Sequence, residues 1–133
     1  MRPTAVLSGS YHRAPERLRR LFRELEVTGC RILSPITLDF DNAPVVRSTN
    51  ETDMSARELE AFHLRALSSS NFLLLHAPDG YVGTSASFEL GYARALRIPC
   101  FSLETPADEM LASQVATVGS VFEILEQLEL RTF

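Results

Sequence analysis

The feature that most constrains the fold is a short, uninterrupted apolar run, FLLLHA, at Phe72 to Ala77. A strand that is apolar at almost every position is covered on both faces, which is typical of a parallel sheet with helices on either side. Two further β-prone runs lie at Thr4 to Ser8 and Arg31 to Ser34, and the segment between them, Ala14 to Val27, repeats its leucines at helical spacing. A strand, a helix and a second strand in this order form the unit from which parallel sheets are built.

The rest of the chain continues this alternation. The segment Ile36 to Met54 has no clear period and is expected to be a long loop. Helices are expected over Ser55 to Leu67, from Thr84 or Ser85 to Leu96, near Ala107 to Ala112 and from Ser120 to Leu128, and strands at Pro99 to Leu103 and Val115 to Val118. We therefore predict an α/β fold, a flavodoxin- or Rossmann-like open parallel sheet of four to five strands with helices on both faces. At 133 residues the chain is expected to be a single domain, residues 1–133.

Composition narrows the classes of function. The formal net charge of −4 argues against a nucleic-acid partner, because surfaces that bind nucleic acids usually carry a basic excess. Arginines do crowd one segment, where a solvated helix face is favoured over a basic patch: Arg13, Arg17, Arg19, Arg20 and Arg23. No apolar run approaches the roughly 20 residues that span a bilayer, and the N-terminus lacks the pattern of a signal peptide. No membrane partner and a cytoplasmic location are therefore expected. The cysteines and histidines show no ligand spacing, so neither a metal nor another cofactor is expected.

Open parallel sheets bind ligands outside the carboxyl ends of their strands. In this chain that rule selects three loops, Gly9 to Arg13, Thr37 to Met54 and Pro78 to Ser87. Gly9 and Ser10 follow the first strand, where a tight turn explains them as well as a ligand does. Ser85 and Ser87 offer hydroxyls and helix N-terminal amides to phosphate or sugar oxygens, although Ser85 could equally be a plain helix cap.

Glu89 is the strongest candidate for chemistry. One helical turn away lie Ala86 and Ala93, so the face that carries Glu89 is largely apolar. A carboxylate on an inward face needs a partner or a purpose, and the nearby helix N-terminus favours its ionised form. Such a group can act as a nucleophile or stabilise the oxocarbenium-like transition state through which glycosidic bonds break. The structural alternative is a partly exposed glutamate that is paired with an arginine such as Arg94.

Two histidines and one glycine have open interpretations. His63 lies mid-helix near the same end of the sheet, where it either faces a bound base or, as we favour, is a satisfied structural histidine. His76 lies inside the apolar strand and is expected to be buried and neutral. Gly91 is most simply explained by a close contact between its helix and a strand.

The stretch His76 to Ala93, HAPDGYVGTSASFELGYA, resembles the nucleoside 2-deoxyribosyltransferase family and its relatives, the 2'-deoxynucleoside 5'-phosphate N-hydrolases. The shared pattern is an apolar strand, a Pro/Asp/Gly loop, and a glutamate followed by Leu/Ile-Gly-Tyr-Ala. The resemblance implies that Glu89 attacks the sugar C1' and releases the base, with water giving hydrolysis and a second base giving transfer. The implied partner is a small-molecule nucleoside or nucleotide, in a homodimer or higher homo-oligomer. The implied substrate-binding residues are Gly9, Ser10, Arg13, His63, Asp79, Gly80, Tyr81, Gly83, Ser85 and Ser87.

The chain departs from the family at three points: the segment after the fourth strand lacks the family's recognisable asparagine, and two positions carry a different residue. The family usually carries a tyrosine on the first strand that orients the glutamate, and the matching position here is Val6, with Tyr11 or Tyr81 as possible substitutes. A family aspartate that recognises or protonates the base corresponds here to His63, which could still donate a proton. The alternatives are thus a binding or sensor module without turnover, or an N-glycosidase of a larger nucleotide such as NAD.

Overall fold

The computed structural model describes residues 2–36, 38 and 54–131, so most of the expected long loop lies outside the described residues. Parallel strands form a five-stranded sheet in the order β2-β1-β3-β4-β5. The strands are β1 (Thr4–Gly9), β2 (Arg31–Ser34), β3 (Phe72–His76), β4 (Cys100–Ser102) and β5 (Ala116–Thr117). This order is that of flavodoxin-like sheets, in which the winding direction reverses between β1 and β3. The predicted open parallel sheet is confirmed.

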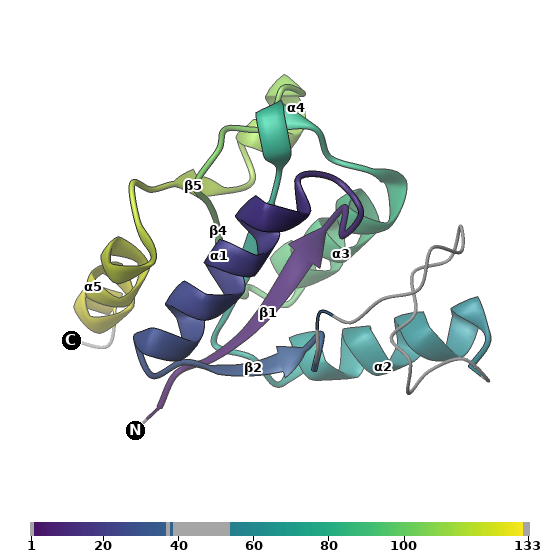
Figure 1. Cartoon of the computed structure of the whole chain (residues 1–133), viewed down its shortest axis with the longest axis horizontal. Coiled ribbons are helices and arrows are strands. Elements are labelled where there is room, and N and C mark those ends of the chain that lie inside the picture. The colour runs from purple at the N-terminus through teal and green to yellow at the C-terminus, as the bar shows by residue number, and fades with distance from the viewer. Residues whose placement is uncertain (1, 37, 39–53, 132–133) are drawn as a thin grey trace.

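Helices cover both faces of the sheet (Figure 1). They are α1 (Pro15–Val27), α2 (Ala56–Ser68), α3 (Thr84–Ala95), α4 (Glu109–Ala112) and α5 (Val121–Arg131), with a short 3-10 turn, η2 (Pro78–Gly80). The buried apolar side chains divide by face, because α1 and α5 share one cluster and α2 and α3 share the other. The alternation of strands and helices expected from the sequence is therefore present.

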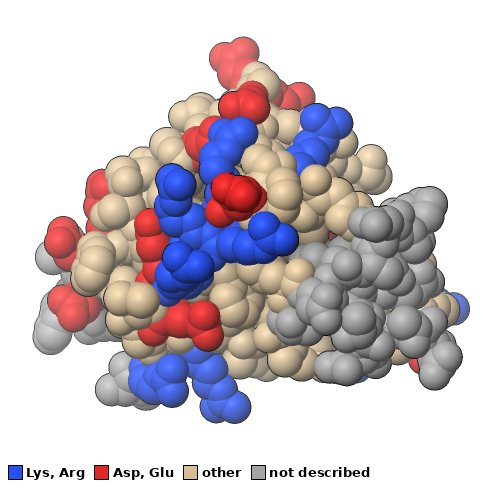
Figure 2. Space-filling view, in the orientation of Figure 1, with Lys and Arg blue, Asp and Glu red and all other residues tan. Residues whose placement is uncertain are grey.

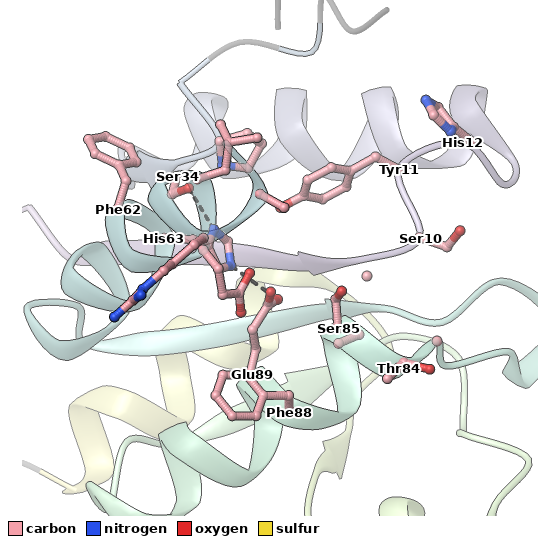
Figure 3. A pocket seen from close by; sticks show the side chains of 18 of the residues that line it. Ser10, Tyr11, His12, Ser34, Phe62, His63, Thr84, Ser85, Phe88 and Glu89 are labelled. Carbon is pink, nitrogen blue, oxygen red and sulfur yellow. Dashed lines mark hydrogen bonds and ion pairs between the residues drawn. The ribbon is translucent and has the colours of Figure 1, made fainter. Parts of the chain in front are cut away.

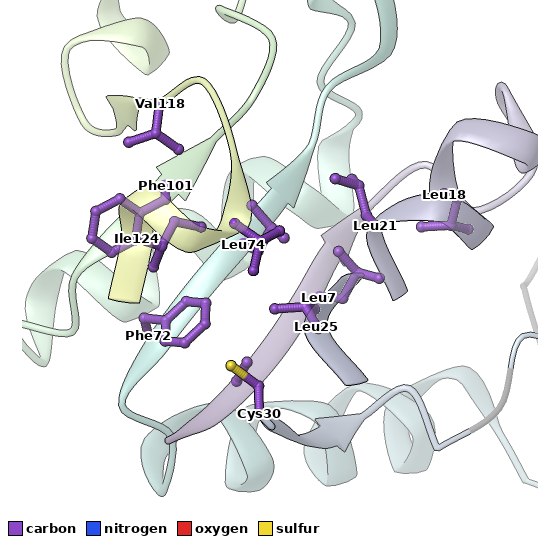
Figure 4. Close-up of a cluster of buried hydrophobic side chains, with 12 residues drawn as sticks. Leu7, Leu18, Leu21, Leu25, Cys30, Phe72, Leu74, Phe101, Val118 and Ile124 are labelled. Carbon is purple, nitrogen blue, oxygen red and sulfur yellow. The ribbon is translucent and has the colours of Figure 1, made fainter. Parts of the chain in front are cut away.

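The core is built around β3, all five residues of which are buried. On the face covered by α1 and α5, the rings of Phe72 and Phe101 meet edge to face, with centroids 6.0 Å apart and planes at 81° (Figure 4), a favoured aromatic geometry. Cys30 and Cys100 are buried free thiols, one in each apolar cluster. The uninterrupted apolar run thus predicts the central, doubly covered strand correctly.

The start of α3 differs from the sequence-based expectation. Its N-cap is Gly83, and no side chain of the described residues caps it, so the expectation that Thr84 or Ser85 caps this helix was wrong. Ser87 instead folds back and donates its hydroxyl hydrogen to the Gly83 carbonyl, at 2.9 Å. The amides of the first turn of α3 are consequently left without a side-chain partner from a cap.

The surface over α1 carries both signs of charge (Figure 2). Arg19, Arg20 and Arg23 are exposed, and Arg17 pairs with Asp79 at 3.2 Å and with Glu104 at 2.8 Å. This mixture fits the solvated helix face favoured from the sequence. Among the described residues, no helix is long and apolar enough to cross a membrane.

Candidate functional site

A cavity of about 830 Å³ opens at the carboxyl ends of β1 and β2, between α2 and the N-terminal half of α3 (Figure 3). This is the place where parallel sheets of this order bind ligands, because the loops after β1 and β3 diverge there. Its volume lies within the range of about 300–1,000 Å³ that is usual for small-molecule sites. The lining residues come from the loops after β1 and β3, the end of β2 and the residues that follow it, the face of α2 and the first turns of α3.

Glu89, the sixth residue of α3, lies at the inner wall of this cavity and is only 6% exposed. Its Oε1 lies 3.2 Å from Nε2 of His63, and the side chains of Glu60 and Ser8 lie close enough to lower its pKa. Burial alone would raise the pKa of Glu89, but the hydrogen bond and charge of His63, together with the hydrogen bonds from Glu60 and Ser8, bring it below its usual value. The site therefore holds a buried, ionised carboxylate.

The structural alternative for Glu89 does not hold. Arg94, its expected partner, donates through Nε to Oε1 of Gln114, at 3.2 Å. Glu89 is buried and not partly exposed, and the ion pair that it makes is with His63. The inward-facing carboxylate predicted from its apolar neighbours is therefore confirmed.

His63 is held at both ring nitrogens. Nδ1 lies 2.6 Å from the hydroxyl of Ser34, and Nε2 lies 3.0 Å from the hydroxyl of Ser8 as well as 3.2 Å from Glu89. Because an ionised carboxylate can only accept hydrogen bonds, Nε2 carries a proton and donates it toward Glu89. The ring lines the cavity and is also fully satisfied, so the favoured structural role fits its contacts.

Glu60 is the second carboxyl group of the site. It lies on α2, one turn before His63, and lines the cavity. Burial, followed by the hydrogen bond and the charge of Glu89, raises the pKa of Glu60 to about 7, against a smaller lowering by His63. Its Oε1 is buried and has no hydrogen-bond partner among the described residues.

The residues predicted to bind substrate divide into two groups. Those that line the cavity together with Glu89 are Gly9, Ser10, His63, Tyr81, Gly83 and Ser85. Gly9 also has a structural reason to be glycine, because it has φ +143° and a Cβ there would lie 2.2 Å from the carbonyl oxygen of His76. The close approach of β3 thus requires Gly9 whether or not a ligand is bound.

The other predicted residues lie outside the cavity lining and hold the surrounding loops. Arg13 places its guanidinium carbon 3.6 Å from the ring centroid of Tyr81. Asp79 pairs with Arg17, which lowers the pKa of that carboxyl. Gly80 packs against Ala107, where a Cβ would lie 3.0 Å from the neighbouring backbone. Ser87 donates to the helix start, as described above.

The structure also tests what was expected of His76 and Gly91. His76 is buried, and its Nε2 donates to the carbonyl of Arg13 at 2.8 Å. Burial lowers the pKa of His76, as expected for a neutral histidine. Gly91 is different, because a Cβ there would meet no atom within 4 Å. The expected close contact between Gly91 and a strand was therefore wrong.

This chain has Val6 where the family has its strand-one tyrosine, and another residue of β1 supplies a hydroxyl near Glu89. Val6 is fully buried in the apolar cluster beneath α3, and the Tyr11 hydroxyl donates to the carbonyl of Leu7 at 2.5 Å. The strand-one hydroxyl that reaches Glu89 belongs to Ser8, two residues after Val6 and on the same face of β1.

Sequence reasoning missed Ser8, Ser34 and Glu60. The sequence indicates a role in the site only weakly for each of them. Ser8 and Ser34 are polar residues at the carboxyl ends of buried strands, and Glu60 lies one turn from His63 on the same helix. Such residue types are common at exposed positions, so their pairing becomes visible only when α2 and α3 are placed side by side over the sheet.

No protein-family model matches the sequence, and no curated protein matches it significantly. Solved structures are similar in fold. A conserved protein from Enterococcus faecalis V583 has a TM-score of 0.68 at 11% identity, over 98% of this chain and 99% of that one. The CMP N-glycosidase BcmB from Clostridium botulinum has a TM-score of 0.56 at 16% identity, over 96% of this chain and 98% of that one. The chain therefore shares its fold with both proteins over almost its whole length.

Proposed function

We propose that this protein is an N-glycosidase that cleaves the base–sugar bond of a nucleoside or nucleoside 5'-monophosphate, with Glu89 as the nucleophile. The observation that carries the proposal is a buried, ionised carboxylate at the wall of a cavity of nucleotide size, held by His63 and Ser8. The fold shared with a CMP N-glycosidase supports the same class of substrate.

The reaction proceeds by double displacement. A carboxylate oxygen of Glu89 attacks C1' of the sugar as the C1'–N bond breaks, which gives a glycosyl ester and the released base. A second attack at C1' breaks the ester: water gives hydrolysis, and a second base gives transfer. His63 and Ser8 fix the direction of the Glu89 carboxylate, so that it is ionised and aimed before substrate arrives.

The N-terminal end of α3 suits the 5' end of a nucleotide. Thr84 and Ser85, the first two residues of α3, line the cavity, and no side chain of the described residues caps this helix. Helix N-termini favour anions through these amides and the helix dipole, and the hydroxyls of Ser10 and Ser85 add donors on the same wall. We therefore expect 5'-monophosphates to be better substrates than the corresponding nucleosides.

A second copy of the chain is proposed to complete the pocket. Phe88 lines the cavity beside Glu89 and yet is 57% exposed. Large aromatic side chains that remain exposed next to a ligand site are typical of interaction surfaces. A homodimer or higher oligomer in solution, measured by light scattering, is the expected state, and it should weaken in Phe88→Ser.

The test is base release from a panel of nucleosides and 5'-monophosphates that begins with CMP and dCMP, followed by chromatography. Wild type, Glu89→Gln and the control Glu126→Gln are compared, since Glu126 is an exposed carboxylate on α5. We expect release by wild type and the control and a loss of at least about 1,000-fold in Glu89→Gln. No release by wild type from any substrate, even with acceptor bases added, would leave a binding module as the better description.

A further inference from the structure

We infer that Glu60 is the general acid that protonates the leaving base, and that its carboxylate then activates the incoming water. This inference rests on the proposed glycosidase function and names a further catalytic residue for it. By the family resemblance, the residue at the position of the family's base-protonating aspartate is His63. If Glu60 protonates the base, the acid lies one helical turn earlier on α2 than in the family.

The two carboxyl groups of the site influence each other's protonation. Glu60 and Glu89 line the same cavity, close enough that Glu89 raises the pKa of Glu60. Two carboxylates cannot both be ionised at such close range, because neither has a proton to donate and their charges repel. The pair therefore holds one proton between them.

The surroundings of the two carboxyl groups determine which of them keeps that proton. Glu89 accepts from His63 and from Ser8, and both contacts favour its charged form. The Oε1 of Glu60, by contrast, is buried and has no hydrogen-bond partner among the described residues. The proton therefore resides on Glu60 while Glu89 stays ionised, which is the protonation state that a nucleophile and an acid require.

The contacts of His63 leave neither of its ring nitrogens available to act as the acid. Its Nδ1 is engaged by Ser34, and its Nε2 by Ser8 and Glu89. A proton donor to the base must be within hydrogen-bond reach of it, and turning the His63 ring toward a base would break the contacts that hold the nucleophile. Glu60 lines the cavity, and neither the His63 nor the Ser8 contact of the nucleophile would have to break for its carboxyl group to reach a base bound there.

The titration of Glu60 suits this role. Burial and Glu89 raise the pKa of Glu60 to about 7, so the acid is protonated below neutral pH and can act as a base once it has given up its proton. The ionisable groups that line the same cavity, besides Glu60 itself, are Tyr11, His12, Arg57, His63, Tyr81 and Glu89.

The two steps balance as follows. In the first, the Glu60 proton moves to a base nitrogen or to an oxygen conjugated with it, the C1'–N bond breaks, and a C1'–O bond to Glu89 forms. In the second, the Glu60 carboxylate takes a proton from water, the water oxygen bonds to C1', and the ester bond to Glu89 breaks. Glu60 is protonated again and Glu89 is ionised again, so no further reactant is needed.

The experiment compares two leaving groups on the same 5-phosphorylated sugar. One is the natural base, which needs protonation, and the other is 4-nitrophenol, which leaves without it. For Glu60→Gln we expect base release to fall by about 100- to 10,000-fold, the usual contribution of general acid catalysis. The same variant should release 4-nitrophenol in a burst of one equivalent per active site, because formation of the ester no longer needs the acid.

Turnover after that burst provides a second readout. Without the Glu60 carboxylate to activate water, the glycosyl ester accumulates, and added azide should restore turnover by attacking C1' directly. Glu60→Asp, which keeps the acid on a shorter side chain, should recover part of the activity on the natural base. Glu126→Gln should behave as wild type with both substrates.

The outcomes separate the inference from the function on which it rests. Full base release by Glu60→Gln would overturn the inference alone. An equal loss with both leaving groups, without a burst, would also overturn it, because Glu60 would then be a structural residue. No release by wild type from either substrate would overturn the proposed function and this inference together.

Discussion

The proton on Glu60 has a consequence for stability that can be measured without any substrate. The half-buried carboxyl group of Glu60 keeps its proton up to about pH 7, against an ordinary pKa of 4.5, so it binds one proton more in the folded than in the unfolded protein between these pKa values. Stability falls with pH wherever the folded state binds more protons. The contribution of Glu60 is therefore fully present below pH 4.5 and is lost as pH rises to about 7.

The size of this loss of stability follows from the gap between the pKa values of Glu60 in the unfolded and the folded protein. The gap between 4.5 and about 7, at about 1.4 kcal/mol for each pH unit, gives about 3 kcal/mol. This value is an upper bound, because Glu60 is half-buried and solvent screens part of the interaction. Glu60→Gln cannot ionise and its amide can donate to Glu89. The free energy of unfolding of the variant, relative to wild type, should therefore rise by up to about 3 kcal/mol between pH 4.5 and pH 8.

The assay is urea unfolding of wild type and Glu60→Gln at several pH values, followed by far-UV circular dichroism because the chain has no tryptophan. Taking the difference between the two proteins cancels the titration of groups that they share. Glu126→Gln, at an exposed position, should show no such trend. A difference between Glu60→Gln and wild type that stays constant across this pH range would refute the assignment of the proton to Glu60.

Three further substitutions test the local geometry. Gly9→Ala should destabilise the fold by several kcal/mol, because its φ is positive and its Cβ would collide with the carbonyl of His76; thermal unfolding would show this as a large fall in Tm. Gly91→Ala should instead stabilise α3 by about 0.5–1 kcal/mol in the same measurement, since its Cβ meets nothing. Ser8→Ala should lower kcat with little change in KM, because Glu89 loses a hydrogen bond that orients it, and an unchanged kcat would remove Ser8 from the site.

Much of the fold could be predicted because it depends on patterns that extend over many residues. The apolar run of β3 predicted a strand covered on both faces, and the leucine spacing of α1 predicted a helix that crosses between parallel strands. The start of α3 was harder, because Thr84, Ser85 and Gly83 are all acceptable caps and only the backbone conformation decides among them.

The candidate site was predictable only in part, for a physical reason. Glu89 could be identified because a carboxylate among apolar helical neighbours conflicts with its surroundings. Glu60 and Ser8 carry no such conflict in the sequence, since their partner lies on another element and becomes their neighbour only through the fold. Asp79 and Arg13 are charged residues within the expected loops, but Asp79 pairs with Arg17 and Arg13 lies over the ring of Tyr81.

The central claim is that Glu89 forms a covalent bond with the sugar, and mass spectrometry tests it most directly. Wild-type protein is mixed with an excess of a 5'-monophosphate substrate, quenched in acid within milliseconds, and digested. The account predicts a peptide containing Glu89 that is heavier by one sugar phosphate in wild type, and no such adduct in Glu89→Gln. Base release by wild type with no adduct on that peptide, and undiminished release by Glu89→Gln, would contradict it.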